Sequence, residues 1–375
     1  MPKLDHVNYS ALDQAKNAFI EAGKKTVKFA AKYGFIPPSG FGASANVFSF
    51  DLRPFLKKGA KHLAVTLLPE GLGTSDDARP DDLKGKKLVK FWHNIGIKTV
   101  AVMTNDAAST GMQTVLISLY LPSANPETVF SKAFMQGFLG GFVEGCKKVG
   151  CVYFSGETPQ LKNKIRSGKL DIAGALFGVM PPGMQPIDGT KLAAGNQIVF
   201  VESSGPHDNG FTSLRKLVEN LPRGYHTRLP NGKEYWEAIN APTILYTPFI
   251  QKVLRAGIQP TSVEPISGHG WQKIMRNKKP LRYVIRQVLP VPPLFRFVEK
   301  MSGTSRRDMI KIFNYGVGLA VFVKSKKDAE KVVAIARKNK LKAIHAGEVK
   351  ASKKREVVIG PFNLTLTDEA FLLKQ

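Results

Sequence analysis

The stretch Ser203-Ser204-Gly205-Pro206-His207-Asp208-Asn209-Gly210 follows the apolar run Ile198-Val199-Phe200-Val201 with one residue between them. This order predicts a buried strand that ends in small, donor-rich residues. Glycines let a backbone approach a ligand closely, and successive N–H groups of such a turn form a concave nest for an anion. The alternative is an ordinary loop between a strand and a helix. The rest of the chain decides between these two interpretations.

The length and composition predict a globular protein of two domains. The chain has 375 residues, of which 43% are hydrophobic, and single cores rarely grow beyond about 250–300 residues. Alternating strand and helix patterns indicate an α/β or α+β fold. The linker pattern Pro181-Pro182-Gly183-Met184 predicts one domain over residues 1–183 and a second over 184–375. No apolar run reaches the roughly 20 residues of a membrane span, and the start lacks the form of a signal peptide, so we expect a cytoplasmic protein.

The net charge of +26 is the most unusual property of the composition. A basic surplus favours anionic partners such as nucleotides, sugar phosphates, RNA or membrane surfaces. The basic residues form short clusters rather than a tail, and they do not alternate with aromatic residues as in single-strand binders. We therefore expect a basic, solvated surface, no membrane partner, and nucleic-acid binding as a secondary possibility only.

Two cysteines, Cys146 and Cys151, lie at a predicted junction of a helix and a strand. Two thiols without a nearby histidine do not make a tetrahedral zinc site, so we expect reduced, buried thiols. The sequence also lacks a phosphate-binding P-loop. The pair Gly316 and Gly318 lacks the third glycine of a dinucleotide fingerprint and precedes a strand.

Acidic residues stand on four glycine-containing or polar loops, which we place at strand ends: Glu70, Asp106, Glu157 and Asp171. Carboxylates in such positions are typical ligands of Mg²⁺, which also contacts substrate phosphates. The alternative is that each carboxylate caps a turn or helix. The four loops in one domain, beside a basic surface, favour the metal interpretation.

The order of these motifs resembles the aminoimidazole ribonucleotide synthase (phosphoribosylformylglycinamidine cyclo-ligase) family, within a superfamily that also holds selenophosphate synthase and thiamine-monophosphate kinase. Ser203–Gly210 matches the family motif Ser-Ser-Gly-Pro-His-Ser-Asn-Gly at seven of eight positions. Further segments with family counterparts are Gly40–Ala43, Pro69–Ser75, Gly96–Gly111, Glu144–Cys151, Ser155–Thr158, Asp171–Gly174, Asn240–Thr243 and Phe313–Gly318.

This resemblance implies a two-domain α/β fold, with an amino-terminal domain for ATP binding and dimerisation. Two such domains would pair into a barrel-like sheet in a homodimer, and the carboxy-terminal domain would be α/β. The implied reaction is the ATP- and Mg²⁺-dependent cyclisation of formylglycinamidine ribonucleotide to aminoimidazole ribonucleotide in purine synthesis. The implied substrate is thus a small phosphorylated molecule.

The resemblance also implies roles for individual residues. Glu70 and Asp106 would hold Mg²⁺, and His207 would be the general acid or base, although it has the alternative role of holding its loop. The implied ATP-binding residues are Gly73, Thr74, Asn105, Gly156, Glu157 and Thr158. The implied substrate- or phosphate-binding residues are Ser203, Gly205, Asn209 and Gly210.

Several positions depart from the family pattern. Glu70 stands for Asp, Ser75 for a lysine that faces phosphate, and Asp208 for a serine. Pro265 replaces the histidine of the segment His-x-Thr-Gly-Gly-Gly, and His269 stands at one of its glycines. These departures keep two alternatives open: another ATP-dependent phosphoryl-transfer enzyme of the superfamily, or a non-catalytic nucleotide- or RNA-associated member.

Overall fold

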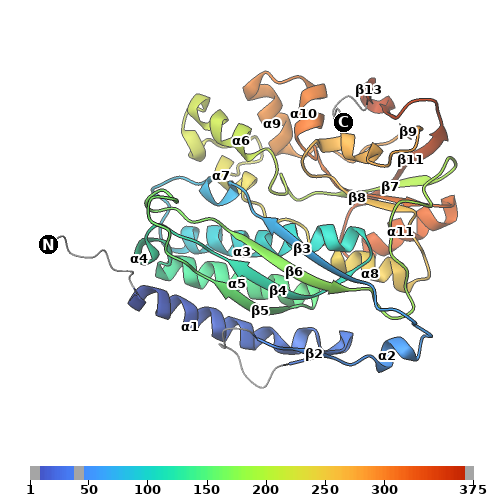
Figure 1. The fold of residues 1–375 in the computed structure, drawn as a ribbon. Helices are drawn as coiled ribbons and strands as arrows, with labels where there is room; N and C mark the ends of the chain where they lie inside the picture. Colours follow the sequence, from blue (N-terminus) through green and yellow to red (C-terminus); the bar gives the residue numbers. More distant parts are fainter. Residues whose placement is uncertain (1–8, 38–45, 368–375) are drawn as a thin grey trace. The chain divides into compact units, whose positions relative to one another are not determined.

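The computed structural model describes residues 9–37 and 46–367, so that the predicted turn Gly40–Ala43 lies outside the described residues. The chain forms two compact units. The first runs up to Asp76 and includes Asp81–Ala107 and Met112–Gly183, and the second comprises Asp77–Pro80, Ala108–Gly111 and the chain from Met184 onward. Figure 1 shows mixed helices and sheets in both, which confirms the predicted two-domain α/β class.

The first unit is built on a four-stranded sheet in the order β3-β6-β4-β5, a half-barrel sheet. Its β4–β5 pair is parallel and its other pairs are antiparallel. The strands are β3 (Val65–Gly71), β4 (Gln113–Tyr120), β5 (Val152–Glu157) and β6 (Ala173–Val179), with a separate pair β1 (Phe35–Ile36) and β2 (Ser49–Phe50). The helices are α1 (Tyr9–Thr26), α2 (Arg53–Leu56), α3 (Gly85–Ser109), α4 (Pro126–Val129) and α5 (Lys132–Val149).

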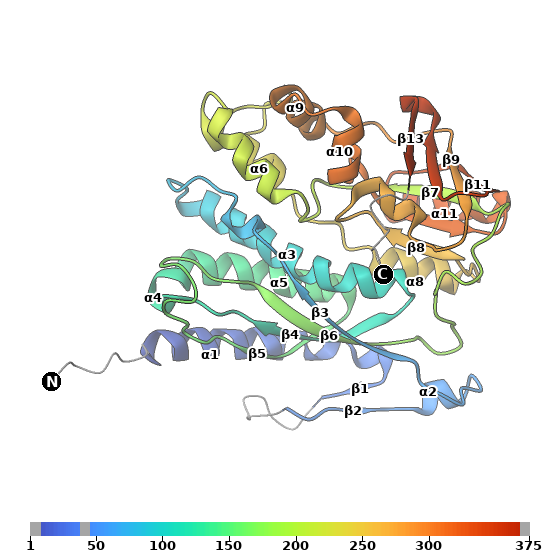
Figure 2. The ribbon, with the colours of Figure 1, turned by 45° about the horizontal axis from the view of Figure 1, so that its top comes forward.

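Helices α3 and α5 pack together on one face of this sheet, and Figure 2 shows β1 and β2 on its opposite side. Glycines make the close helix packing possible. A Cβ on Gly141 would lie 1.8 Å from the carbonyl oxygen of His93, and one on Gly96 would lie 2.2 Å from that of Phe138. These distances are shorter than any real contact, so the two backbones approach as closely as they do only because both positions lack side chains.

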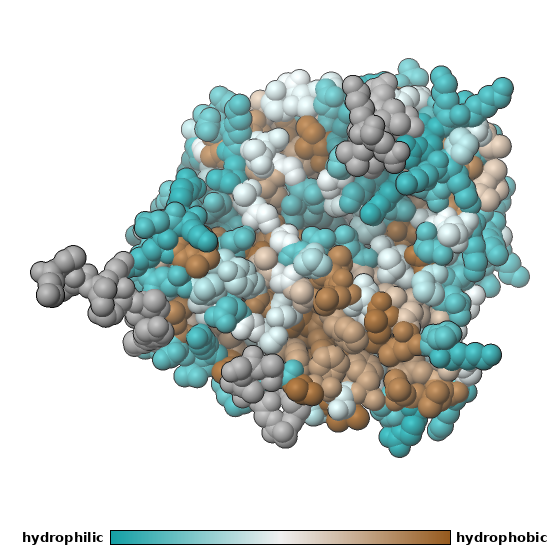
Figure 3. Space-filling view, in the orientation of Figure 1, coloured by the Kyte–Doolittle hydropathy of each residue, from teal (hydrophilic) through white to brown (hydrophobic). Residues whose placement is uncertain are grey.

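The opposite face of the same sheet remains partly open to solvent. Along β3 the side chains alternate, and Val65 and Leu67 on the open face are 50% and 75% exposed. Their direct partners in β6 are Val179 and Phe177, so that the open face is apolar across two strands. The brown area in Figure 3 shows this apolar surface.

The second unit is built on a seven-stranded mixed sheet in the order β13-β12-β9-β11-β7-β10-β8. Its strands are β7 (Gln197–Glu202), β8 (Ser262–Pro265), β9 (Leu281–Ile285), β10 (Val317–Val323), β11 (Ala343–Ala351), β12 (Glu356–Ile359) and β13 (Leu364–Thr367). Its helices are α6 (Phe211–Leu217), α7 (Tyr235–Ile239), α8 (Thr247–Arg255), α9 (Pro293–Ser302), α10 (Arg306–Ile312) and α11 (Lys326–Lys338).

Strand β7 lies inside this sheet and has a hydrophobic core on each face. Ile198 and Phe200 belong to one core cluster, whereas Val199 and Val201 belong to the other. Helices α8 and α11 contribute to the second cluster. A strand that is buried on both faces must be apolar along its length. The end of this apolar strand fixes the position at which the Ser203–Gly210 loop begins. No helix in the described part of the chain is long and apolar enough to span a membrane.

Candidate functional site

Asn314 holds the Ser203–Gly210 loop in the second unit. This side chain is fully buried, and its Oδ1 accepts hydrogen bonds from the hydroxyl of Ser203 at 2.8 Å and from the backbone N–H of Gly316 at 3.1 Å. Its Nδ2 donates to the carbonyl oxygen of Gly205 at 2.8 Å. The backbone N–H of Ser203 donates to the carbonyl of Gly316 at 3.0 Å. The predicted segments 203–210 and 313–318 are thus joined into one structure.

The imidazole of His207 is turned into its own loop. Its Nε2 accepts the backbone N–H of Ser204 at 3.1 Å, so that nitrogen carries no proton and the neutral ring is protonated on Nδ1. The residue is only 7% exposed, and a Cβ on Gly318 would lie 2.8 Å from its Cε1. This geometry is typical of a histidine that holds a loop, the alternative role named above. The acid–base role stays a prediction.

The residues after His207 are held by neighbouring segments as well. Asp208 has a positive φ of 59°, and its Oδ2 accepts a hydrogen bond of 2.7 Å from the hydroxyl of Thr243. Asn209 donates from Nδ2 to the carbonyl of His207 at 2.7 Å. Gly210 has φ 73°, and a Cβ there would lie 2.2 Å from the ring of Phe313, so only glycine fits. The carboxylate of Asp208 thus has a hydroxyl donor in the segment 240–243.

A second loop, Ser267–Gly270, lies beside the first. A Cβ on Gly268 would lie 3.5 Å from Oδ1 of Asn209. His269 is exposed and has a positive φ of 70°, and the ammonium of Lys273 donates to the hydroxyl of Ser267. Sequence reasoning missed Lys273, because a lysine three residues beyond a glycine loop has no distinctive signal. Two polar loops and a cation therefore gather at one end of β7 and β8.

In the first unit, strand register places Glu70 close to α3. Glu70 pairs with Gly174, and the same row continues through Leu119 to Gly156. A Cβ on Gly174 would lie 3.0 Å from Sδ of Met103, so α3 crosses the sheet directly over this row. Asp106 lies one turn further along α3. The two predicted metal ligands thus lie on adjacent layers of the unit, one in the sheet and one on the helix that crosses it.

The predicted position of Asp106 at a strand end was wrong. Residues 99–105 continue α3, which extends to Ser109, so Asn105 and Asp106 lie on its last two turns. The run Thr99–Asn105 is mostly apolar and fits a strand or the start of a helix, and periodicity does not distinguish the two over such a length. Asn105 is buried, and Asp106 is half-buried.

The remaining predicted nucleotide residues lie on two loops of the first unit. Gly73, with φ 71°, and Thr74 form an exposed turn after β3. At the end of β5, Gly156 allows a close approach, because a Cβ there would lie 2.8 Å from the carbonyl of Leu119. Glu157 is exposed, and its Oε1 accepts the N–H of buried Thr158 at 3.3 Å.

The carboxylates of Glu70 and Asp106 fit a magnesium ion whose remaining ligands are phosphate oxygens and water. Within residues 9–37 and 46–367, no group of three or more His, Cys, Asp or Glu side chains is arranged to hold a metal. Mg²⁺ is commonly held by one or two carboxylates together with water and substrate phosphates, so Glu70 and Asp106 are sufficient in number. Asp106 also lies in the last turn of α3, where the helix dipole disfavours a carboxylate and a cation would offset this.

Two buried polar residues near these loops were not predicted. Lys98 is fully buried in the middle of α3, and Asp76 is 6% exposed in the turn after Thr74. Both form polar interactions. Lys98 stands in the apolar run Ile95–Val102, and a single lysine there carries no signal in sequence.

Comparisons with known proteins agree with this architecture. The family model described as AIR synthase related protein, N-terminal domain, matches residues 81–180. A phosphoribosylformylglycinamidine cyclo-ligase from Gloeobacter violaceus is 31% identical over 230 residues, covering 60% of this chain and 67% of that protein. The enzyme of the same name from Clostridium acetobutylicum is 28% identical over 338 residues, covering 88% and 95%.

Solved structures with the same fold include E. coli HypE, a hydrogenase maturation protein, and a thiamine-monophosphate kinase from Stenotrophomonas maltophilia. HypE superposes with a TM-score of 0.61 at 18% identity and covers 95% of this chain and 96% of its own. The kinase gives 0.60 at 15% identity, covering 94% and 96%. A HypE crystal structure in complex with ATP gives 0.60 at 13% identity, covering 96% and 93%.

The half-barrel sheet and the seven-stranded sheet define a fold class that this chain shares with HypE and thiamine-monophosphate kinase. Within this class, the chain belongs to the phosphoribosylformylglycinamidine cyclo-ligase (AIR synthase) family.

Proposed function

We propose that this protein catalyses the ATP-dependent cyclisation of formylglycinamidine ribonucleotide to aminoimidazole ribonucleotide. The observation that carries the proposal is the Ser203–Gly210 loop. It matches the family motif at seven of eight positions, Asn314 holds it, and it lies beside the loop Ser267–Gly270. The relatives named as this cyclo-ligase support the same reaction.

In this proposal the two loops of the second unit bind the ribose phosphate of the substrate. Asn209 and Gly210 contribute donors near the phosphate, whereas Ser203 and Gly205 shape the loop through their hydrogen bonds to Asn314. Lys273 supplies a cation from the neighbouring segment. His207 either transfers a proton or holds the loop, and its Nε2 hydrogen bond favours the second role.

The first unit binds ATP in this proposal. Glu70 and Asp106 hold Mg²⁺, which would offset the charge of the triphosphate. Asn105 lies beside Asp106, and the glycine turns at Gly73 and Gly156 let the backbone approach the nucleotide. Thr74, Glu157 and Thr158 belong to the same two turns.

The chemistry consists of two coupled steps. The formyl oxygen attacks the γ-phosphorus of ATP, and the bond to the β-phosphate oxygen breaks to release ADP. The ring-forming nitrogen then attacks the activated carbon, loses a proton, and the carbon–oxygen bond breaks to release inorganic phosphate. Both steps depend on positioning and on donors for the developing charge.

The deciding experiment supplies the purified protein with Mg²⁺, ATP and formylglycinamidine ribonucleotide and measures aminoimidazole ribonucleotide and ADP by mass spectrometry. We expect equal amounts of both products, and their loss in Asp106→Asn. ATP binding without any aminoimidazole ribonucleotide would contradict the proposal.

A second candidate is ATP-dependent phosphoryl transfer to a different small molecule. The observation in its favour is the Ser267–Gly270 loop, where exposed His269 has a positive φ of 70°. A substrate-dependent release of ADP with a panel of phosphorylated acceptors, but not with formylglycinamidine ribonucleotide, would favour this candidate.

The open face of the first unit supports a homodimer as the working form. Leu67 is 75% exposed and Val65 50% exposed, and both lie next to apolar partners in β6. We propose that the same face of a second copy covers them, which is the self-complementary arrangement of a two-fold dimer. Light scattering should give twice the chain mass, and Leu67→Lys should give a monomer. A monomeric wild-type protein at micromolar concentration would contradict this proposal.

A further inference from the structure

Two basic segments meet at one end of the sheet in the second unit. Residues 276–286 and 348–356 together contain nine Lys and Arg residues and two Glu residues, which is a quarter of the chain's net charge in 20 positions. Register brings them together, because Lys350 of β11 and Glu356 of β12 both pair with Arg282 of β9. We call these two segments the basic end.

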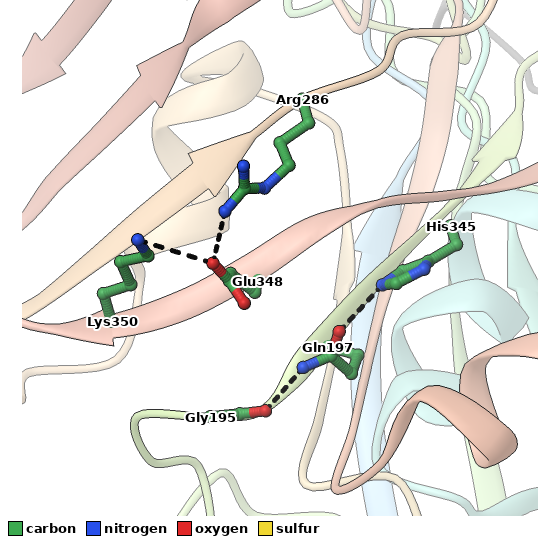
Figure 4. A network of polar contacts seen from close by, with 6 residues as sticks. All are labelled: Gly195, Gln197, Arg286, His345, Glu348 and Lys350. Carbon is green, nitrogen blue, oxygen red and sulfur yellow. Dashed lines mark hydrogen bonds and ion pairs between the residues drawn. The ribbon is translucent and has the colours of Figure 1, made fainter.

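The ion pairs of the basic end leave a large positive surplus. Glu356 contacts Arg282 at 2.7 Å, and Figure 4 shows Glu348 between Arg286 and Lys350, at 2.6 and 3.5 Å. Within the described part of the chain, the side chains of four further cations of the basic end contact neither a carboxylate nor a carbonyl: Arg276, Lys278, Lys353 and Lys354. All four side chains are exposed.

A hollow of about 580 Å³ opens beside the first two of these cations. Arg276 and Lys278 line it, and its wall includes buried Ser262 and Glu264 of β8, whose side chains hydrogen-bond at 2.7 Å. Asn277 and Lys279 fix another part of its lining by donating to the carbonyls of Gly189 and Thr190, at 2.8 and 2.6 Å. The volume suits a single nucleotide. A carboxylate in the wall would accept a hydrogen bond from the amino or imino group of a base.

We propose that the basic end binds single-stranded RNA, with phosphates at Arg276, Lys278, Lys353 and Lys354 and one unstacked nucleotide in the hollow. Unstacked bases are the usual targets of protein–RNA recognition, whereas a duplex presents none. A membrane surface is disfavoured, because membrane-bound faces carry large apolar side chains and the exposed large hydrophobic residues that the structure describes all lie between Ile36 and Tyr120. This binding is independent of the proposed cyclisation.

Charge contacts should dominate the affinity, because the described lining of the hollow contains no aromatic ring. Four phosphate contacts to a single strand predict a slope of about −3 in a plot of log K against log salt concentration. The probe is a fluorescein-labelled 20-residue oligouridine, measured by fluorescence anisotropy between about 50 and 300 mM salt.

The test variant replaces Arg276, Lys278, Lys353 and Lys354 by Ala, and circular dichroism verifies its fold. We expect binding to weaken by about 100-fold or more at about 100 mM salt, since each lost phosphate contact removes part of the counterion release. The matched control replaces the exposed residues Lys326, Lys327, Lys331 and Lys338 of α11, which removes the same charge outside the basic end. It should stay within threefold of the wild type.

Several results would overturn the proposal. An equal loss in the α11 control would show general attraction to a basic protein. Equally tight binding of phosphatidylserine vesicles would indicate a membrane surface, and equal competition by polyglutamate would indicate acidic proteins. Equal affinity for a duplex of the same length would contradict binding of an unstacked nucleotide in the hollow. If a nucleotide does bind there, Glu264→Gln should weaken RNA binding with no effect on cyclisation.

Discussion

The hydroxyl of Ser203 donates a 2.8 Å hydrogen bond to Oδ1 of Asn314, across 111 positions of sequence. Because Nδ2 of the same side chain donates to the carbonyl of Gly205, one buried amide fixes the first three residues of the loop. The loop that carries the proposed function is therefore shaped by a residue that we did not predict as part of the site.

Replacement of Asn314 by Ala should lower the free energy of unfolding by about 3 kcal/mol, because it leaves the Gly205 carbonyl and the Ser203 hydroxyl buried without their partner. Ser203→Ala is the matched control and should lose about 1 kcal/mol, since only one bond disappears. Urea denaturation measures both values. Equal losses in the two variants would show that the amide does not organise the loop.

His207→Ala separates the two roles of the imidazole. Loss of a general acid or base typically lowers kcat by about 10²–10⁴-fold without unfolding the protein. The hydrogen bond from Ser204 to Nε2 leads us to expect a raised KM and a lower melting temperature instead, with kcat within about tenfold. A drop in kcat beyond 100-fold at unchanged melting temperature would restore the catalytic role.

Two adjacent glycines in α5 should respond in opposite directions. Gly141→Ala places a Cβ 1.8 Å from the carbonyl of His93 and should destabilise the first unit by about 3 kcal/mol or more. Gly140 is exposed, and a Cβ there would lie 3.5 Å from the His93 ring. Gly140→Ala should therefore stabilise the helix by about 0.5–1 kcal/mol. Thermal unfolding of both variants tests the close packing of α3 and α5. Similar melting temperatures of the two variants would contradict that packing.

The buried thiols predict a loss of stability in alkali. Burial, together with a hydrogen bond from Cys151, raises the pKa of the Cys146 thiol well above its usual range. The neutral thiol therefore contributes to the free energy of unfolding. This contribution is fully present below the pKa that the thiol has in the unfolded chain, and it is lost as the pH rises above that pKa. Between about pH 8.5 and 10 the loss should reach about 2 kcal/mol. Urea denaturation should show this fall in the wild type and a smaller one in Cys146→Ala, and equal falls would contradict it.

The sequence was sufficient for the features that depend on local pattern. The apolar run before Ser203 predicted a strand, which the structure has as β7. Strand β10, buried along its whole length, and helix α11, buried on one face, have equally regular patterns. Unbroken burial and regular periodicity are local properties of a chain, so these elements could be recognised from their own residues.

Features that depend on distant contacts could not be recognised in this way. Strands β8 and β9 have four and five residues and owe their existence to pairing with distant strands. The continuation of α3 through Asn105 was missed because its buried residues are apolar on most sides. Lys98 and Asn314 were missed for a related reason. They are distinguished by being buried, and the burial of a single polar residue cannot be predicted from its sequence neighbours.

The open face around Leu67 links the lifetime of the folded chain to its abundance. In a dimer this apolar surface would be buried against the second copy, and in a monomer it is exposed to water. A ligand that binds only the folded state stabilises that state in proportion to the logarithm of the ligand concentration. The chain would then serve as its own stabilising ligand. Its melting temperature should rise with each tenfold increase in protein concentration. At low concentration the protein would be the most readily degraded.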